Sequence, residues 1–277
     1  MQSTNDMPKN INPSRSSATE HNWRGAVAAS NLCNDIFAAT LFLTRIPIGR
    51  AQQLHTNLAT ATRTFPFIGA IVGLFGGLVF GFAIFVGMTP FLSALITLGA
   101  IILITGALHE DGLADTADGL GGGSTPITRL KIMRDSQIGV FGGLALILSV
   151  LVRVGSLTAL SDPWLVAAAL IAAGSLSRCI LPWIMSSIEL ASAKGVAAAV
   201  GKPSIGSAVI AVLGGGVLSV LCLGLTHGII ILTLAALVAW LWGYLARRFL
   251  GGYNGDLLGA VQQTVEIVVL LAAVALV

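Results

Sequence analysis

The sequence predicts an all-α, polytopic integral membrane helix bundle of about seven transmembrane helices, and three observations support this. First, 55% of the 277 residues are hydrophobic and only 10% are charged, whereas about 25% of a typical soluble domain is charged. Second, seven apolar stretches reach the roughly 20 residues that a membrane-spanning helix needs. Third, the basic residues collect in alternate connections between these stretches. Lipid must therefore face much of the chain.

The seven expected spans are long runs of mostly apolar residues. They lie near Phe65–Met88, Phe91–Leu108, Ile138–Leu160, Trp164–Met185, Ile205–Leu225, Gly228–Ala246 and Leu257–Val277. An eighth apolar stretch, Ile36–Ile48, is too short to cross comfortably, so we expect a short N-terminal interfacial or re-entrant helix there. Residues 1–27 are polar and contain no signal-peptide core, which predicts a disordered tail. Residues 28–277 are expected to form a single transmembrane domain.

The basic residues also predict the orientation of the bundle. The alternate connections near residues 89–90, 161–163 and 226–227 carry no Lys or Arg, and the other connections carry nine. These nine are Arg50, Arg63, Arg129, Lys131, Arg134, Lys194, Lys202, Arg247 and Arg248. Positively charged connections stay on the cytoplasmic side of a membrane. We therefore expect the charged connections in the cytoplasm and the C-terminus outside.

One acidic loop, residues 109–119, falls on the cytoplasmic side. Its four carboxylates are Glu110, Asp111, Asp115 and Asp118. Helical spacing of i, i+4 and i+7 would place the three aspartates on one face, where they repel each other unless a cation neutralises them. Mg²⁺ takes such oxygen ligands together with water and substrate phosphates. We predict that these four carboxylates bind Mg²⁺, although a solvated acidic face is the alternative.

The residues on either side of the carboxylates extend this hypothesis. His109 directly precedes them and is a candidate for acid–base chemistry, because imidazole titrates near neutral pH. The glycine run 121–123 suits either a phosphate-binding loop or a plain linker. Arg134 follows, and guanidinium groups bind phosphate oxygens well. We therefore predict that Arg134 binds phosphate, whereas nearby Lys131 anchors the loop at the membrane.

Charged residues inside the expected spans are a further signal, because such residues face protein or water-filled cavities. They are Arg153, Arg178 and Glu266. The last span carries a polar stripe that starts at its cytoplasmic edge, formed by Asp256, Gly259, Gln263 and Glu266. We count Asn254, Asp256, Glu266 and Arg178 as candidates for binding substrate or phosphate. A buried structural ion pair remains the alternative for Arg178 and Glu266.

The order of these motifs resembles the cobalamin synthase family, the adenosylcobinamide-GDP ribazoletransferases of the inner membrane. The resemblance covers roughly residues 36–270 and rests on the segments 43–47, 65–69, 106–119, 133–139 and 254–260, together with Glu266. The acidic segment is the specific motif, and the others support it by order and spacing. The first segment, Leu-Thr-Arg-Ile-Pro, contributes Arg45 to the candidates for substrate or phosphate binding.

The resemblance implies a Mg²⁺-dependent transferase of the phosphotransferase type, acting in cobalamin biosynthesis at the cytoplasmic side of the cell inner membrane. α-Ribazole or its 5′-phosphate would attack the phosphate of adenosylcobinamide-GDP. GMP would leave, and adenosylcobalamin or its phosphate would form. Asp111, Asp115 and His109 would be the catalytic residues. The expected partners are the two substrates and the lipid bilayer, with no nucleic acid and with a homo-oligomer left open.

Two other functions stay open on the sequence. CDP-alcohol phosphotransferases carry the motif D-x-x-D-G-x-x-A-R, and Asp111 with Gly112 matches part of it. However, Leu108 stands where the preceding aspartate is expected, and no arginine follows Ala114. A cation-coupled transporter is less favoured, because the carboxylates cluster at one face rather than near the bilayer midplane.

Overall fold

The computed structural model describes residues 32–48 and 57–276, and within these ranges the chain folds into helices. Among the described residues there is no β-strand, only one isolated bridge between Leu190 and Tyr253. The all-α prediction is therefore confirmed. The tail predicted at residues 1–27 lies outside the described residues.

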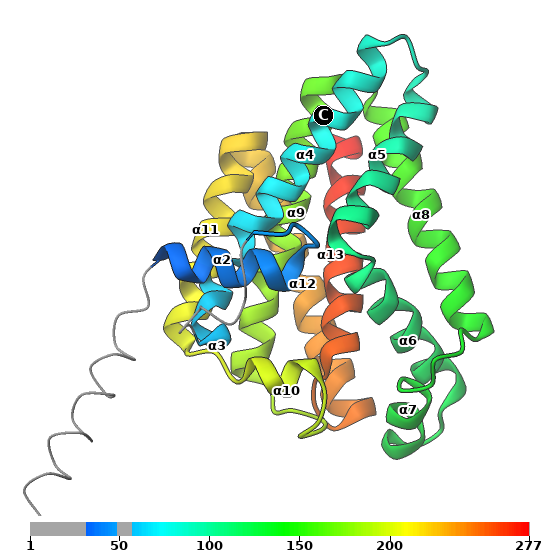
Figure 1. The fold of residues 1–277 in the computed structure, drawn as a ribbon, viewed down its shortest axis with the longest axis vertical. Coiled ribbons are helices and arrows are strands. Elements are labelled where there is room, and N and C mark those ends of the chain that lie inside the picture. Colours follow the sequence, from blue (N-terminus) through cyan, green and yellow to red (C-terminus); the bar gives the residue numbers. More distant parts are fainter. Residues whose placement is uncertain (1–31, 49–56, 277) are drawn as a thin grey trace, which may run out of the picture.

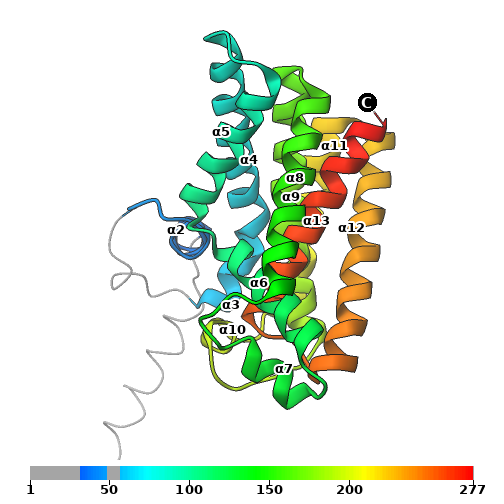
Figure 2. The same cartoon turned by 90° about the vertical axis from the view of Figure 1, so that its right-hand side faces the viewer.

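Six helical runs in the described chain are long and apolar enough to cross a membrane, and they run alongside one another (Figures 1 and 2). The first, Leu58–Phe85, combines α3 (Leu58–Ala61), η2 (Thr62–Thr64) and α4 (Phe65–Phe85). The others are α8 (Val140–Leu160), α9 (Pro163–Ser187), α11 (Ile205–Leu223), α12 (Leu225–Leu245) extended by η3 (Ala246–Leu250), and α13 (Gly255–Leu276). They confirm six of the predicted spans.

The seventh predicted span differs from a straight helix. Helix α5 (Pro90–Thr105) has only 16 residues, and the chain bends by 91° before it continues as α6 (Leu108–Gly122). Gly106 and Ala107 form the bend with left-handed φ values of +68° and +56°. Only glycine adopts such a conformation without strain. The prediction that the acidic segment forms a loop is therefore corrected. The segment forms helix α6, which turns away from the direction of α5 (Figure 1).

Helix α9 is the central element and packs against α4, α11, α12 and α13. Its crossing with α4 depends on small residues. Gly69 and Gly174 approach so closely that a Cβ atom on either would overlap the carbonyl group of the other. Small residues at helix crossings allow such close packing in membranes, where the hydrophobic effect does not drive helix association.

Helix α2 (Leu32–Leu43) crosses the bundle instead of running with the spans (Figures 1 and 2). It corresponds to the short apolar stretch that we expected not to cross the membrane. Its buried Asp35 forms an ion pair with Arg63 of η2, with a distance of 2.6 Å between Oδ2 and Nη2. This pair ties α2 to the base of the α4 span.

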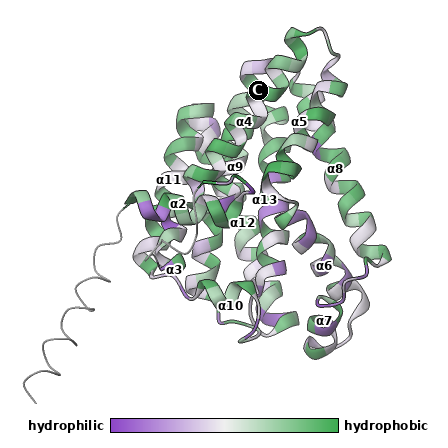
Figure 3. Ribbon diagram, in the orientation of Figure 1, coloured by the Kyte–Doolittle hydropathy of each residue, from purple (hydrophilic) through white to green (hydrophobic). Residues whose placement is uncertain are grey.

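The polar residues gather at one end of the bundle. This end carries α6, α7 (Pro126–Ile132) and α10 (Val196–Val200), whereas the opposite end is largely hydrophobic (Figure 3). Arg129 joins two connections there: its Nη1 donates to the carbonyl of Phe249 in η3 at 3.1 Å, and its guanidinium lies 4.8 Å from the Phe249 ring centroid. Two of the basic connections that the sequence grouped together, those that carry Arg129 and residues 247–248, thus meet at this end.

Candidate active site

The site forms where α6 crosses α13 at two glycines. A Cβ atom on Gly112 would lie 2.7 Å from the carbonyl oxygen of Asp256 and 3.1 Å from the Cα of Gly259. The two backbones can approach this closely because neither glycine has a side chain. The crossing places the first two turns of α6, with Asp111 and Asp115, beside the start of α13, with Asp256.

These three aspartates form a carboxylate cluster. Asp111 is exposed, while Asp115 and Asp256 are half-buried. Their negative charges act on one another: Asp111 and Asp256 both repel Asp115, and Asp111 repels Asp256. The pairing of Asp111 with Asp115 follows the helical spacing of the sequence. The sequence did not predict that Asp256, from the last helix, would join them.

Two polar groups support Asp256. Asn254 donates from Nδ2 to Oδ2 of Asp256 at 2.8 Å, and its own Oδ1 accepts from the backbone N–H of Leu257 at 3.0 Å. Asn254 thus caps the first turn of α13 and orients the carboxylate. The positive charge of Arg134 also acts on Asp256, while Nη2 of Arg134 donates to Oγ of Ser192 at 2.7 Å. Both predicted binding residues therefore belong to the surroundings of this cluster.

Asp118, the third aspartate of the predicted metal face, points to a different partner. Its Oδ2 accepts from the backbone N–H of Gly139 at 2.7 Å, and its Oδ1 accepts from that of Gly142 at 2.9 Å. The carboxylate therefore caps the N-terminus of α8, where it satisfies free backbone donors and interacts favourably with the helix dipole. This geometry gives Asp118 a structural task at the start of α8, while its negative charge also repels Asp115.

Glu110 is likewise turned away from the cluster. Nη1 of Arg153 lies 3.0 Å from Oε1 of Glu110 and 3.3 Å from Oε1 of Glu266. Nη1 of Arg178 lies 3.9 Å from the other oxygen of Glu266. All four residues are buried, with both arginines only 1% exposed. They form a buried ion network that joins α6, α8, α9 and α13.

Two glutamines complete this network. Gln262 donates to Oε2 of Glu266 at 2.6 Å, and Gln263 donates to Oε1 of Glu110 at 3.2 Å. The network matches the structural alternative for Arg178 and Glu266, because it pairs their charges inside the bundle. The intramembrane charges were visible in the sequence, but the pairing of Arg153 with Glu110 requires the tertiary arrangement.

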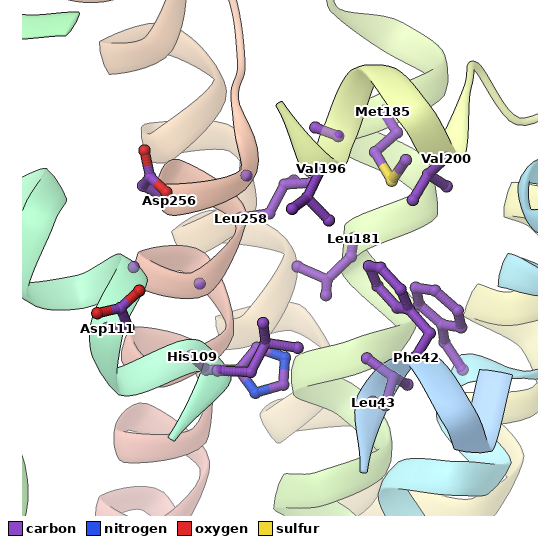
Figure 4. A pocket seen from close by; sticks show the side chains of 16 residues that line it. Phe42, Leu43, His109, Asp111, Leu181, Met185, Val196, Val200, Asp256 and Leu258 are labelled. Atoms are coloured by element: carbon purple, nitrogen blue, oxygen red, sulfur yellow. The ribbon is translucent and has the colours of Figure 1, made fainter. Parts of the chain in front are cut away.

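A cavity of about 140 Å³ opens beside the carboxylates. Figure 4 shows Asp111 and Asp256 on one side of it and a group of apolar side chains on the other, with the ring of His109 between them. The apolar residues labelled there are Phe42, Leu43, Leu181, Met185, Val196, Val200 and Leu258. His109 is 4% exposed, and its imidazole has no hydrogen-bond partner among the described residues.

Arg45 lies just outside this group, at the bend between α5 and α6. Its backbone N–H donates to the carbonyl of Ile104 at 2.7 Å, and its side chain covers Gly106. A Cβ atom on Gly106 would overlap the Arg45 side chain. The exposed guanidinium of Arg45 therefore stands near the start of α6 and the residues that line the cavity.

Comparison with known proteins decides the family. Residues 35–274 match the family described as cobalamin-5-phosphate synthase. The chain belongs to this cobalamin synthase family. It is 44% identical over 252 residues to a protein of Bradyrhizobium diazoefficiens named adenosylcobinamide-GDP ribazoletransferase, covering 91% of this chain and 97% of that one.

Other relatives carry the same name. The chain is 43% identical to one from Xanthobacter autotrophicus, over 87% of this chain and 95% of the relative, and 38% identical to one from Rhizobium johnstonii, over 86% and 95%. No solved structure matches the chain. The family assignment makes the protein a transferase of cobalamin biosynthesis and leaves the CDP-alcohol phosphotransferase and transporter hypotheses without support.

The carboxylate cluster could hold a divalent cation only together with ligands from outside the protein. Within the described residues no three His, Cys, Asp or Glu side chains are grouped closely enough to hold a metal ion by themselves. Mg²⁺, however, commonly uses only one or two carboxylates and takes its other ligands from water and phosphate. Asp111, Asp115 and Asp256 provide such oxygens from two helices, and their mutual repulsion favours a bound cation.

Proposed function

We propose that the protein joins adenosylcobinamide-GDP to α-ribazole or α-ribazole 5′-phosphate, giving adenosylcobalamin or its phosphate together with GMP. The single observation that carries this proposal is the carboxylate cluster of Asp111, Asp115 and Asp256 beside a largely apolar cavity at the polar end of the bundle. The names of the relatives support the choice of substrates.

The proposed chemistry is a phosphoryl transfer. A hydroxyl oxygen of α-ribazole attacks the phosphorus that is bonded to the cobinamide side of the diphosphate. A new P–O bond forms, the P–O bond to GMP breaks, and the hydroxyl proton leaves. Developing negative charge on the diphosphate and on GMP must be neutralised, and positioning and electrostatic stabilisation supply most of the catalysis in such reactions.

The proposal gives the residues of the cluster and its surroundings three tasks: metal binding, phosphate binding and proton acceptance. Asp111, Asp115 and Asp256 hold Mg²⁺, which neutralises the diphosphate and the leaving phosphate when it is bound. Arg134, whose charge acts on Asp256, and Arg45, at the bend before α6, are both exposed and would bind phosphate oxygens that the metal leaves free. Asp115 and His109 are the candidates to accept the hydroxyl proton, because one lies in the cluster and the other faces the adjoining cavity.

We further propose that the site opens to the cytoplasm at the inner membrane. Lys131, Arg134, Arg247 and Arg248 lie in connections at the same end as the cluster, and positively charged connections stay in the cytoplasm. Nucleotide-activated substrates are made in that compartment. The orientation can be measured by labelling single cysteines placed in the connections of a chain inserted in sealed vesicles.

The decisive experiment uses the purified full chain in detergent with adenosylcobinamide-GDP, α-ribazole and Mg²⁺. We expect release of GMP. The release should stop when EDTA removes the metal, and it should recover when Mg²⁺ is added back. The same preparation with CDP-diacylglycerol and an alcohol should release no CMP. Absence of GMP together with release of CMP would overturn the proposal, and solute uptake into vesicles without any chemistry would favour a transporter instead.

A further inference from the structure

We propose that the apolar cavity beside the carboxylate cluster is the binding site for the aromatic base of the acceptor, and that helix α10 determines which base is accepted. This inference rests on the proposed function. The acceptor, α-ribazole, is a riboside of 5,6-dimethylbenzimidazole, which is a flat and largely apolar bicyclic group attached to a polar sugar.

The walls of the cavity match such a group. Phe42 of α2 and Phe65 of α4 both line it, and their rings stack with centroids 5.8 Å apart and planes inclined by 13°. Leu181 and Met185 of α9 add aliphatic surface on the same side as Phe42, away from Asp111 and Asp256 (Figure 4). Aromatic and apolar walls favour a flat apolar ligand, and flexible methionine adapts to its outline.

The polar end of the cavity matches the rest of the acceptor. Asp111 and Asp256 lie at one side, so a base held among the apolar residues would have its ribose directed toward the carboxylates (Figure 4). His109 stands between the two parts and has a buried imidazole with no hydrogen-bond partner among the described residues. An imidazole beside the cavity can donate a hydrogen bond to a ligand. The unsubstituted ring nitrogen of the base would accept it.

Size excludes the other large groups of the substrates. A cavity of about 140 Å³ cannot enclose a corrin ring, whereas apolar cavities of about 150 Å³ do bind flat aromatic molecules such as benzene. The cavity would take the flat apolar part of the base, and the remainder of the bicyclic group would extend toward the carboxylates. The guanine base of the donor has several polar groups, and the aliphatic walls offer them no partners, so its burial there would be unfavourable. The apolar base of the acceptor is the part of the reaction that fits best.

Helix α10 forms one wall of this cavity and is not a membrane span. It contributes Val196, Ala197 and Val200, and it is held between Gly195 and Gly201, which have φ values of +105° and +83°. Ala197 is buried against the cavity, whereas Ala199 of the same helix is exposed. Ala197 therefore limits the space that is available to substituents on the base.

The test compares Ala197→Leu with the matched control Ala199→Leu in the full-length protein. Each variant is assayed with α-ribazole and with the riboside of unsubstituted benzimidazole, which lacks two methyl groups. In the unchanged protein, KM for the unsubstituted acceptor should be about tenfold higher, because two buried methyl groups are lost. Ala197→Leu should raise KM for α-ribazole about tenfold or more and reduce or reverse this preference.

The control and the donor separate this effect from general damage. Ala199→Leu should keep both KM values, and KM for adenosylcobinamide-GDP should stay the same in both variants. Equal KM values for the two variants with α-ribazole, or an unchanged base preference in Ala197→Leu, would overturn the assignment. If Ala197→Leu does not fold, Phe42→Leu replaces it in the comparison. Phe37→Leu is then the control, because Phe37 is exposed on the same helix, α2. A raised KM for α-ribazole is expected only for Phe42→Leu.

Failure of this inference can be told apart from failure of the proposed function. If the unchanged protein releases no GMP, the proposed function fails, and equilibrium dialysis of α-ribazole against the protein then tests the cavity alone. If the unchanged protein and Ala199→Leu retain α-ribazole and Ala197→Leu retains less of it, the cavity is supported as a binding site. If both variants retain it equally, or if the protein retains none, the assignment is overturned.

Discussion

Gly112 of α6 and Gly259 of α13 meet with their backbones in contact. A Cβ atom on Gly259 would lie 3.0 Å from the Cα of Gly112 and 3.0 Å from the carbonyl oxygen of His109. This crossing brings Asp111 and Asp256 together although they are far apart in the sequence. The geometry of the proposed metal site therefore depends on two residues that have no side chain.

Replacing Gly112 with alanine should reduce activity by moving the two helices apart. The new Cβ would lie 2.7 Å from the carbonyl oxygen of Asp256, so the backbone must shift. A displacement of about 1 Å at a reacting centre can lower the rate about 10²-fold. The measurement is kcat/KM for GMP release. Gly155→Ala on α8 is the control, because a Cβ there meets nothing within 4 Å, and similar losses in both variants would contradict the explanation.

Asp111→Asn and Asp256→Asn should each reduce GMP release by about 10²-fold or more and raise the Mg²⁺ concentration needed for half-maximal rate, because each removes a proposed metal ligand. Membrane insertion should be unchanged. Asp135→Asn serves as the control. Asp135 is exposed, and within residues 32–48 and 57–276 its carboxylate accepts only from the backbone N–H of Gln137, at 3.2 Å. A normal Mg²⁺ dependence in Asp256→Asn would remove α13 from the proposed metal site.

The predicted spans came close to the observed helices because length and apolar composition determine which segments can cross a membrane. The exception is the bend after Thr105, where the sequence offers Gly106 as the only local signal and Ala107 adopts a left-handed conformation without being a glycine. Such a conformation depends on the surrounding structure. A hydropathy pattern therefore could not distinguish a straight span that ends in a loop from two helices joined at 91°.

The prediction of the site was limited in a similar way. Helical spacing correctly placed Asp111 and Asp115 near each other, because that relationship is local. It also grouped Asp118 with them, and the charge of Asp118 does act on Asp115. Spacing could not reveal that both Asp118 oxygens accept hydrogen bonds from the N-terminus of α8. Asp256 joins the cluster through a tertiary crossing. Its polar stripe was visible in the sequence, whereas its partner on α6 was not.

Asp118→Ala should therefore affect stability more than metal dependence. Loss of the cap at the N-terminus of α8 should lower the free energy of unfolding by about 1–2 kcal/mol. Thermal unfolding in detergent measures this loss, and the Mg²⁺ concentration for half-maximal GMP release should stay within about twofold of the unchanged protein. Asp111→Asn is the comparison with the opposite pattern. If Asp118→Ala raised the Mg²⁺ concentration for half-maximal GMP release as much as Asp111→Asn does, Asp118 would have to be a metal ligand after all.

Arg153→Met should be the most destabilising of these substitutions. The Arg153 side chain lies between Glu110 and Glu266 and is 1% exposed, so its removal leaves two carboxylates without their main partner inside the bundle. Breaking a buried ion pair in this way costs about 3–5 kcal/mol. The fraction of folded protein after heating in detergent should fall sharply, and Arg248→Met, which changes an exposed arginine of η3, should behave like the unchanged protein.

The charge argument can be tested by a second substitution in the same chain. Adding Glu266→Gln to Arg153→Met removes the charge of one of the two carboxylates that lost Arg153, while Gln262 can still hydrogen-bond to the new amide. The double variant should therefore be more stable than Arg153→Met alone, because the coupling between the two positions is lost together with the charge. The contrary result is additivity, in which Glu266→Gln lowers the free energy of unfolding of Arg153→Met by as much as it lowers that of the unchanged protein. Packing of the Arg153 side chain, rather than charge pairing, would then explain why Arg153 is important.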